Sequence, residues 1–315
     1  MKNTIVLLIL LLLMTYQLKG EEPKAIFGSD NRQDIYQSPR QIQDMSSGLG
    51  TWLSEVFTEE SATGVNLLFP SIGKEYLLCP GEKFEEQPTT MISCTGFLVA
   101  PNLLMTAGHC LINVGTAQNE VTPMCEDFKW LFDYQYSNPL QELLLGISKE
   151  RIATCKNVIY AKNIGEGNDR QDWGLVELDR SFPERFVFNK FATSIKKGML
   201  SSILGFPSGL PLKFSRGGFI LKDNPEAEFF EANIDAVGGN SGSPVFNNRG
   251  ELQGILVRGN VDFVTDQERN CDKWNKCSAN GRKCDDGTQE EDYDSGMHVQ
   301  KITAEIIKLI EKNSL

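Results

Sequence analysis

The sequence predicts an all-β protein, a barrel or a sandwich, that ends in one α-helix. Three observations predict this class. Short stretches rich in Val, Ile, Leu and Phe recur along the chain, Gly, Pro and Asn separate them, and an apolar stripe with helical spacing lies near the C-terminus. With 315 residues, of which 40% are hydrophobic and 23% charged, the chain can bury one large core or two adjoining ones.

The expected strands are short apolar runs bounded by residues that favour turns. They occupy residues 91–100, 103–106, 174–178, 199–205, 219–221 and 251–257. Between two such runs, residues 247–250 read Asn-Asn-Arg-Gly and predict a hairpin turn, because Asn and Gly tolerate a positive φ. So many short runs favour an all-β fold over alternating β and α units.

The only helical pattern lies at the end of the chain. Val299, Ile302, Ile306 and Ile310 recur at steps of three and four residues, which predicts a helix over residues 298–312. The preceding residues 260–294 are polar, acidic and carry three cysteines. We expect them to form a disulfide-tied surface insertion, since their Asp-Asp-Gly stretch lacks the alternating oxygen ligands of a calcium loop.

The N-terminal residues resemble an export signal. Lys2 precedes an unbroken apolar run over residues 5–14, which is too short to span about 30 Å of hydrocarbon. We therefore expect a signal peptide over residues 1–20, with an uncleaved membrane anchor as the alternative. Residues 21–48 are expected to be an N-terminal arm or a short pro-segment before a domain over 49–315. The predicted location is secreted or periplasmic, without stable membrane association once the signal is removed.

Charge and cysteine content exclude several functions. A net charge of −11, from 31 basic and 42 acidic residues, disfavours binding to nucleic acid or to an anionic membrane surface. With two histidines and no Cys-x-x-Cys pair, the even number of cysteines predicts disulfides rather than a zinc site, and we expect no metal or other cofactor. The eight cysteines are Cys79, Cys94, Cys110, Cys125, Cys155, Cys271, Cys277 and Cys284.

Acyl transfer to a serine needs a hydroxyl nucleophile, a base and a carboxylate that orients the base. His109 follows an apolar run directly, whereas His298 is expected to be an ordinary core or surface side chain. Asp172 opens another apolar run; Asp179, at the far end of that run, is the neighbouring alternative.

The candidate nucleophile lies in a Gly-rich turn. Residues 238–244 read Gly-Gly-Asn-Ser-Gly-Ser-Pro, and the glycines let the backbone adopt strained angles around Ser241. The same freedom would let the N–H groups of Gly239 and Ser241 point to one spot, as an oxyanion requires. Taken alone, this pattern would favour an ordinary hairpin turn.

Taken together, these motifs resemble those of trypsin-like serine proteases. Residues 94–99 and 104–110 resemble the histidine region of that family, Asp172 with its apolar followers the aspartate motif, and residues 239–244 the serine motif. The order His, Asp, Ser matches, and so do the separations of 63 and 69 residues.

The resemblance implies two six-stranded antiparallel β-barrels with a cleft between them. It implies Ser241 as nucleophile, His109 as general base, Asp172 as the group that fixes the imidazole tautomer, and an oxyanion hole formed by the N–H groups of Gly239 and Ser241. It also implies a disulfide between Cys94 and Cys110, and leaves the other six cysteines with fifteen possible arrangements.

The function implied is a serine endopeptidase that acts on protein or peptide substrates. The alternative is a catalytically inactive relative that serves as a binding module. The oligomeric state stays open.

Departures from the trypsin pattern bear on maturation. Asn240 stands where digestive enzymes have an aspartate that pairs with a new N-terminus, so that activation switch is expected to be absent. With Asn at this position, the motif is most similar to the bacterial glutamyl-endopeptidase-like branch. Residues 26–32 resemble the mature beginning of that branch, which implies processing close to Ile26.

Specificity is the second departure. Leu256 stands where that branch has a histidine that recognises glutamate, and an apolar residue cannot bind a carboxylate. Asp235 falls where trypsin has the aspartate that binds Lys or Arg, which implies that preference unless its side chain turns away. The strand edge at Val257 and Arg258 is expected to pair with the substrate backbone.

Overall fold

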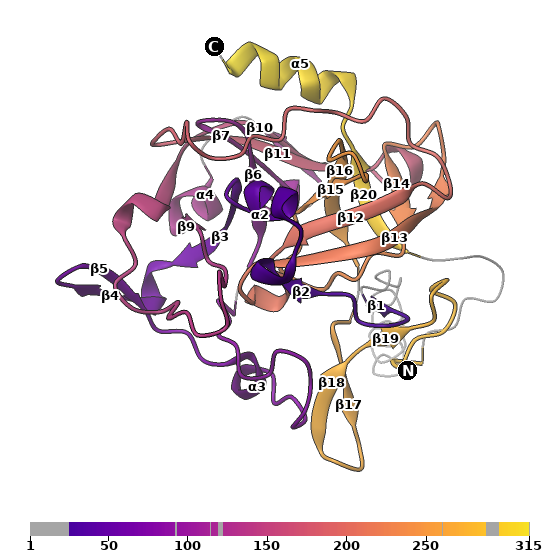
Figure 1. Cartoon of the computed structure of the whole chain (residues 1–315). Helices are drawn as coiled ribbons and strands as arrows, with labels where there is room; N and C mark the ends of the chain where they lie inside the picture. Colours follow the sequence, from indigo (N-terminus) through magenta and orange to yellow (C-terminus); the bar gives the residue numbers. More distant parts are fainter. Residues whose placement is uncertain are drawn as a thin grey trace, which may run out of the picture.

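The computed structural model describes residues 25–91, 93–113, 115–118, 122–259, 261–287 and 296–314. Within these ranges two antiparallel β-barrels lie side by side (Figure 1). The all-β prediction and the two six-stranded barrels implied by the family resemblance are both confirmed. The predicted signal peptide, residues 1–20, lies outside the described residues.

The first barrel has the strand order β11-β7-β6-β3-β9-β10, and pairing of β11 with β10 closes it. An outer strand, β8, pairs with β10. The strands are β3 (Leu49–Ser54), β6 (Thr95–Ala100), β7 (Leu103–Thr106), β8 (Thr116–Gln118), β9 (Phe128–Phe132), β10 (Ile152–Ile164) and β11 (Gln171–Leu178).

The second barrel has the order β12-β15-β16-β20-β14-β13 and closes through β12 and β13. An outer strand, β2, pairs with β13. The strands are β2 (Gln33–Asp34), β12 (Leu200–Gly205), β13 (Lys213–Asp223), β14 (Phe229–Ala232), β15 (Pro244–Phe246), β16 (Leu252–Arg258) and β20 (Met297–Lys301).

Short pairings lie outside the barrels. β4 and β5 form a hairpin, β17 and β18 form another, and β1 runs parallel to β19. They are β1 (Ile26–Phe27), β4 (Thr58–Ser61), β5 (Gly64–Leu67), β17 (Phe263–Asp266), β18 (Cys271–Trp274) and β19 (Lys276–Cys277). The α-helices are α2 (Arg40–Ser46), α3 (Ile72–Glu75), α4 (Pro123–Asp127) and α5 (Ala304–Asn313), and 3-10 turns cover Ile35–Gln37, Glu55–Phe57, Gly108–Cys110, Lys149–Arg151, Gly167–Asp169 and Pro207–Gly209.

The C-terminal helix begins later than residue 298, where the sequence predicted it. Met297 and Val299 alternate inward into the core of the second barrel, so these residues extend β20 instead. The helix starts only after Thr303, whose hydroxyl caps it by accepting the Ile306 N–H. Ile306 and Ile310 of the predicted apolar stripe are buried in the largest core cluster, which contains most of the first-barrel core. Helix α5 lies at the top of Figure 1. No helix in the described ranges is long and apolar enough to cross a membrane.

A third, smaller cluster joins segments that lie far apart in the sequence. Its buried members are Ile26, Ile72, Leu78, Leu210, Val237 and Trp274. The described part of the predicted insertion, residues 261–287, contains β17, β18 and β19, while residue 260 and residues 288–294 lie outside the description. The described part of the expected arm begins at residue 25, and its first two residues have no exposed surface: Ala25 belongs to the core of the second barrel and Ile26 to this third cluster.

Four disulfides link the described cysteines. Cys94 pairs with Cys110, as the family resemblance implied. The three other pairs are Cys79–Cys271, Cys125–Cys155 and Cys277–Cys284. The first of these three ties the loop after α3 to β18, which joins the insertion to the N-terminal half of the chain.

Candidate active site

The structure brings His109 and Asp172 together at the end of two paired strands. Thr106 at the end of β7 lies opposite Gly174 in β11, so the residues that follow β7 meet the residues that open β11. His109 Nδ1 lies 2.9 Å from Asp172 Oδ2, and the His109 backbone N–H donates to Oδ1 at 2.9 Å. Gly108 permits this approach, because a Cβ there would lie 1.8 Å from the Lys162 carbonyl oxygen.

Electrostatics favour the ionised form of the Asp172 carboxyl. Its side chain is 1% exposed, and burial alone would raise its pKa. The charge and hydrogen bonds of His109, together with the Arg258 guanidinium, outweigh burial and lower the pKa below its ordinary value. The His109 side chain is 32% exposed, so solvent reaches one side of the pair.

The Ser241 loop packs against the first barrel beside His109. The Ser241 carbonyl oxygen accepts the Thr95 N–H at 2.7 Å and lies 3.9 Å from Cys110 Sγ. Gly242 has φ +89°, and a Cβ there would lie 2.0 Å from the Thr95 carbonyl oxygen, so only glycine fits. In the part of the chain that the structure describes, the Ser241 hydroxyl makes no hydrogen bond, including none to His109.

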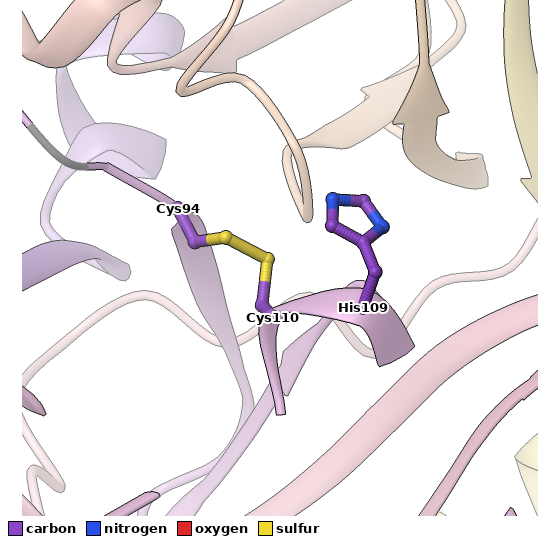
Figure 2. A group of neighbouring side chains, drawn as sticks. All are labelled: Cys94, His109 and Cys110. Carbon is purple, nitrogen blue, oxygen red and sulfur yellow. A yellow bond between two sulfur atoms is a disulfide. The ribbon is translucent and has the colours of Figure 1, made fainter. Parts of the chain in front are cut away.

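A disulfide fixes the histidine turn to the neighbouring strand. Figure 2 shows the Cys94–Cys110 bond beside the His109 ring. The possible ligand atoms of these three residues lie within 4.8 Å of one another, which is close enough for a metal site. Both sulfurs are bonded to each other, however, so neither is a thiolate ligand and the cluster braces the turn instead.

The two predicted oxyanion donors are the backbone N–H groups of Gly239 and Ser241. The Gly238 carbonyl oxygen accepts the Ser208 N–H at 2.5 Å. Because this peptide unit is planar and trans, the Gly239 N–H points away from Ser208. Among the described residues, neither the Gly239 N–H nor the Ser241 N–H donates to another group. The Asn240 side chain is buried within the same turn and donates to the Val237 carbonyl at 3.2 Å.

Asp235 binds the N-terminal segment of its own chain. Its two carboxylate oxygens accept the backbone N–H groups of Phe27 and Asn31, both at 2.7 Å. Burial raises the pKa of Asp235 to about 6, and the two backbone hydrogen bonds only partly offset this. This placement of Asp235 differs from the predicted one, in which its carboxylate would face a Lys or Arg side chain of the substrate. Both carboxylate oxygens instead accept hydrogen bonds from the chain itself.

The remaining predicted residues lie on β16 and β20. Leu256 is buried in the second barrel, and its N–H and carbonyl bond to Ser243 O and Gly242 N. Val257 is buried, whereas Arg258 is 30% exposed and reaches toward Asp172. His298 is buried and stacks on Phe229, in agreement with its expected structural role.

Sequence reasoning missed two contacts to Asp172 from the second barrel. Gln300 Oε1 accepts the Asp172 N–H at 3.0 Å, and an Arg258 nitrogen lies 3.9 Å from Asp172 Oδ2. Both contacts join residues that are far apart in sequence, and nothing in the local pattern of either segment marks them. The register between β16 and β20 places Gln300 opposite Ile255, and the contacts between the two barrels then bring both strands near β11 and Asp172.

Several solved structures are similar to this chain. They include a Glu endopeptidase in complex with MPD (TM-score 0.48, 14% identity, 92% of this chain and 99% of that chain). A thermostable serine protease from an extremophilic microorganism has a TM-score of 0.45 at 15% identity, over 85% of this chain and 97% of that one. An inactivated protease paralogue of the scabies mite has a TM-score of 0.49 at 10% identity, over 93% and 98%.

A family model provides the assignment. The model for the trypsin-like peptidase domain matches residues 94–255, which is just over half of the chain and contains His109, Asp172 and Ser241. The chain therefore belongs to the trypsin-like peptidase family.

Proposed function

We propose that this protein is an exported serine endopeptidase that hydrolyses peptide bonds through an acyl-enzyme. The observation that carries the proposal is the His109–Asp172 pair, held by two hydrogen bonds of 2.9 Å beside the Gly-rich turn of Ser241. A base oriented by a buried carboxylate next to a serine on a Gly-rich turn is the arrangement that serine acyl transfer requires.

Each residue of the site has defined roles in the reaction. Ser241 Oγ attacks the substrate carbonyl carbon while His109 Nε2 takes the hydroxyl proton. Asp172 accepts the Nδ1–H and so presents Nε2 to the serine. The amides of Gly239 and Ser241 donate to the developing oxyanion. His109 then protonates the leaving amine, the peptide bond breaks, and a water molecule activated by His109 releases the acyl group from Ser241.

Substrate recognition is proposed at the end of β16. The backbone at Val257 and Arg258 would pair with an extended substrate, and Leu256 disfavours a glutamate before the scissile bond because its side chain is apolar and buried. A Lys or Arg preference through Asp235 has less support, since both carboxylate oxygens bind Phe27 and Asn31.

Export and maturation complete the proposal. Four disulfides fit an oxidising compartment, which agrees with the signal peptide expected over residues 1–20. Processing near Ile26 would leave the new amino group beside Asn275, whose carbonyl oxygen accepts the Ile26 N–H at 3.0 Å.

Labelling with a fluorophosphonate tests this function. We expect one covalent adduct on Ser241, no adduct on Ser241→Ala, and normal labelling of Ser243→Ala, a matched control in the same turn. Folded protein that takes up no label, or takes it up elsewhere, would contradict the proposal and favour a binding module.

A further inference from the structure

Two side chains of the second barrel converge on Asp172, which belongs to the first barrel. They come from neighbouring strands, Gln300 from β20 and Arg258 from β16. The ladder places Ile255 opposite Gln300, and an irregularity between Leu256 and Arg258 turns the end of β16 out of regular register. Residues of the second barrel therefore contact the Asp172 side of the His109–Asp172 pair.

Gln300 holds the backbone of Asp172. Its Oε1 accepts the Asp172 N–H at 3.0 Å, while its Nε2 donates to the Glu228 carbonyl at 2.9 Å and to the Lys301 carbonyl at 3.3 Å. The side chain is 1% exposed. A buried amide with donor and acceptor both engaged has one orientation, so it fixes the position of the Asp172 backbone relative to β20.

Arg258 acts on the Asp172 carboxylate by charge. The closest approach, 3.9 Å to Oδ2, is too long for a hydrogen bond but close for Coulomb attraction. Besides His109, Arg258 is the cation that lowers the pKa of Asp172. Because the guanidinium is 30% exposed, solvent screens part of this attraction.

We propose that Gln300 and Arg258 are positioning residues for the His109–Asp172 pair. Both Asp172 oxygens accept hydrogen bonds from His109, so the position of Asp172 sets the orientation of the imidazole. Gln300 in turn holds the Asp172 backbone. Arg258 opposes protonation of the pair. This inference rests on the proposed peptidase function. It implies that the orientation of the His109–Asp172 pair in the first barrel depends on how the second barrel packs against it.

Gln300→Met tests the backbone contact. It removes the acceptor for Asp172, and we expect kcat to fall about tenfold to a hundredfold with little change in KM. Gln253→Met is the matched control, because Gln253 is also 1% exposed and bonds Ser201 and Leu200 within the second barrel. It should lose comparable stability and keep kcat. Equal kcat for both variants, measured on the folded fraction, would overturn the role of Gln300.

Arg258 offers a second test that does not threaten the fold, because the side chain is partly exposed. In Arg258→Gln the pair takes up a proton more readily, so the acid limb of the kcat/KM profile should move to higher pH by roughly half a unit. Arg258→Lys should return the acid limb to its wild-type pH, because it restores the positive charge. Arg185→Gln, which breaks a partly buried ion pair to Asp133, should leave it unchanged.

The outcomes separate this inference from the proposed function. If hydrolysis depends on Ser241 but Arg258→Gln has the wild-type pH profile and Gln300→Met the wild-type kcat, only the positioning roles fail. A rise in KM alone for Arg258→Gln would likewise contradict positioning and assign Arg258 to substrate binding. If the wild type shows no hydrolysis that Ser241→Ala abolishes, the proposed function and this inference fail together.

Discussion

Asp172 accepts two hydrogen bonds from the single residue His109, one from its backbone and one from its ring. The two bonds, each 2.9 Å long, fix the backbone turn after β7 and the direction of the imidazole with one carboxylate. Because that carboxylate is buried and its pKa is lowered, it holds the ring in the tautomer with a proton on Nδ1 and leaves Nε2 free to accept one.

Asp172→Asn should therefore lower kcat by about 10⁴, because an amide donor facing His109 favours the wrong tautomer. Asp179→Asn is the control. Asp179 lies beyond the other end of β11, where its carboxylate accepts the Thr154 N–H at 2.9 Å, and this variant should keep kcat. Steady-state kinetics on both variants make the comparison. A similar loss in the two variants would assign the effect to folding rather than to the pair.

Gly242→Ala should unfold the serine turn. The new Cβ would lie 2.0 Å from the Thr95 carbonyl oxygen, and φ at this position is +89°. We expect a loss of about 4 kcal/mol or more in unfolding free energy, together with loss of fluorophosphonate labelling. Gly198→Ala isolates the strain of the positive φ, since Gly198 has φ +85° with no atom within 4 Å of the added Cβ. It should lose only about 1 kcal/mol. Equal losses would contradict the packing of Gly242 against β6.

The strands that the sequence predicted best are short apolar runs with turn residues at both ends. Residues 103–106 match β7, and residues 251–257 match β16 to within one residue. The long strand β10 was missed, because most of its residues are only partly buried and its apolar alternation is weak. Val299 was assigned to a helix because its spacing of three residues from Ile302 fits a helix face, and only its pairing with Leu256 of β16 shows that it belongs to a strand.

The features of the candidate site also divide into those that a local motif reveals and those that depend on contacts between distant parts of the chain. The motifs around His109, Asp172 and Ser241 are local, so their order and spacing were enough to find them. The partners of Asp235 lie more than 200 residues away in sequence, at Phe27 and Asn31. A motif position says which residue stands there but not which backbone amides reach it, and so the occupied carboxylate could not be predicted.

Asp235 should make stability depend on pH in the direction opposite to that of most carboxylates. Its pKa rises from 3.8 to about 6 in the folded state, mainly through burial, with Asp30 adding to the rise and Arg32 opposing it. The fold thus favours the protonated form, and stability falls as pH rises from about 4 to about 6, by about 2–3 kcal/mol.

Asp235→Asn removes this titration. The unfolding free energy of the wild type minus that of the variant should decrease by about 2–3 kcal/mol between pH 4 and pH 7. Denaturant unfolding at several pH values measures the difference, and the contribution of Asp172 cancels because both proteins contain it. A difference that is constant or grows with pH would contradict a pKa of Asp235 that burial raises in the folded state.

Of the two disulfides that involve the insertion, Cys79–Cys271 should contribute more to the unfolding free energy than Cys277–Cys284. It closes a sequence separation of 192 residues, against 7 for Cys277 and Cys284. On the chain-entropy model, the double alanine variant of the long link should lose about 2–5 kcal/mol, and that of the short link less. Unfolding without reductant compares the two variants. A larger loss for the short link would contradict the view that Cys79–Cys271 ties the insertion to the N-terminal half.

The most direct test of the central claim is the rate of peptide-bond hydrolysis on a peptide library, measured for the wild type, Ser241→Ala, His109→Ala and Asp172→Ala. Residues that act as one unit predict losses of several orders of magnitude for each variant, with a double variant of Ser241 and His109 no worse than either alone. Folded wild-type protein that cleaves no peptide, or cleavage that survives Ser241→Ala, would contradict the assignment of a serine peptidase.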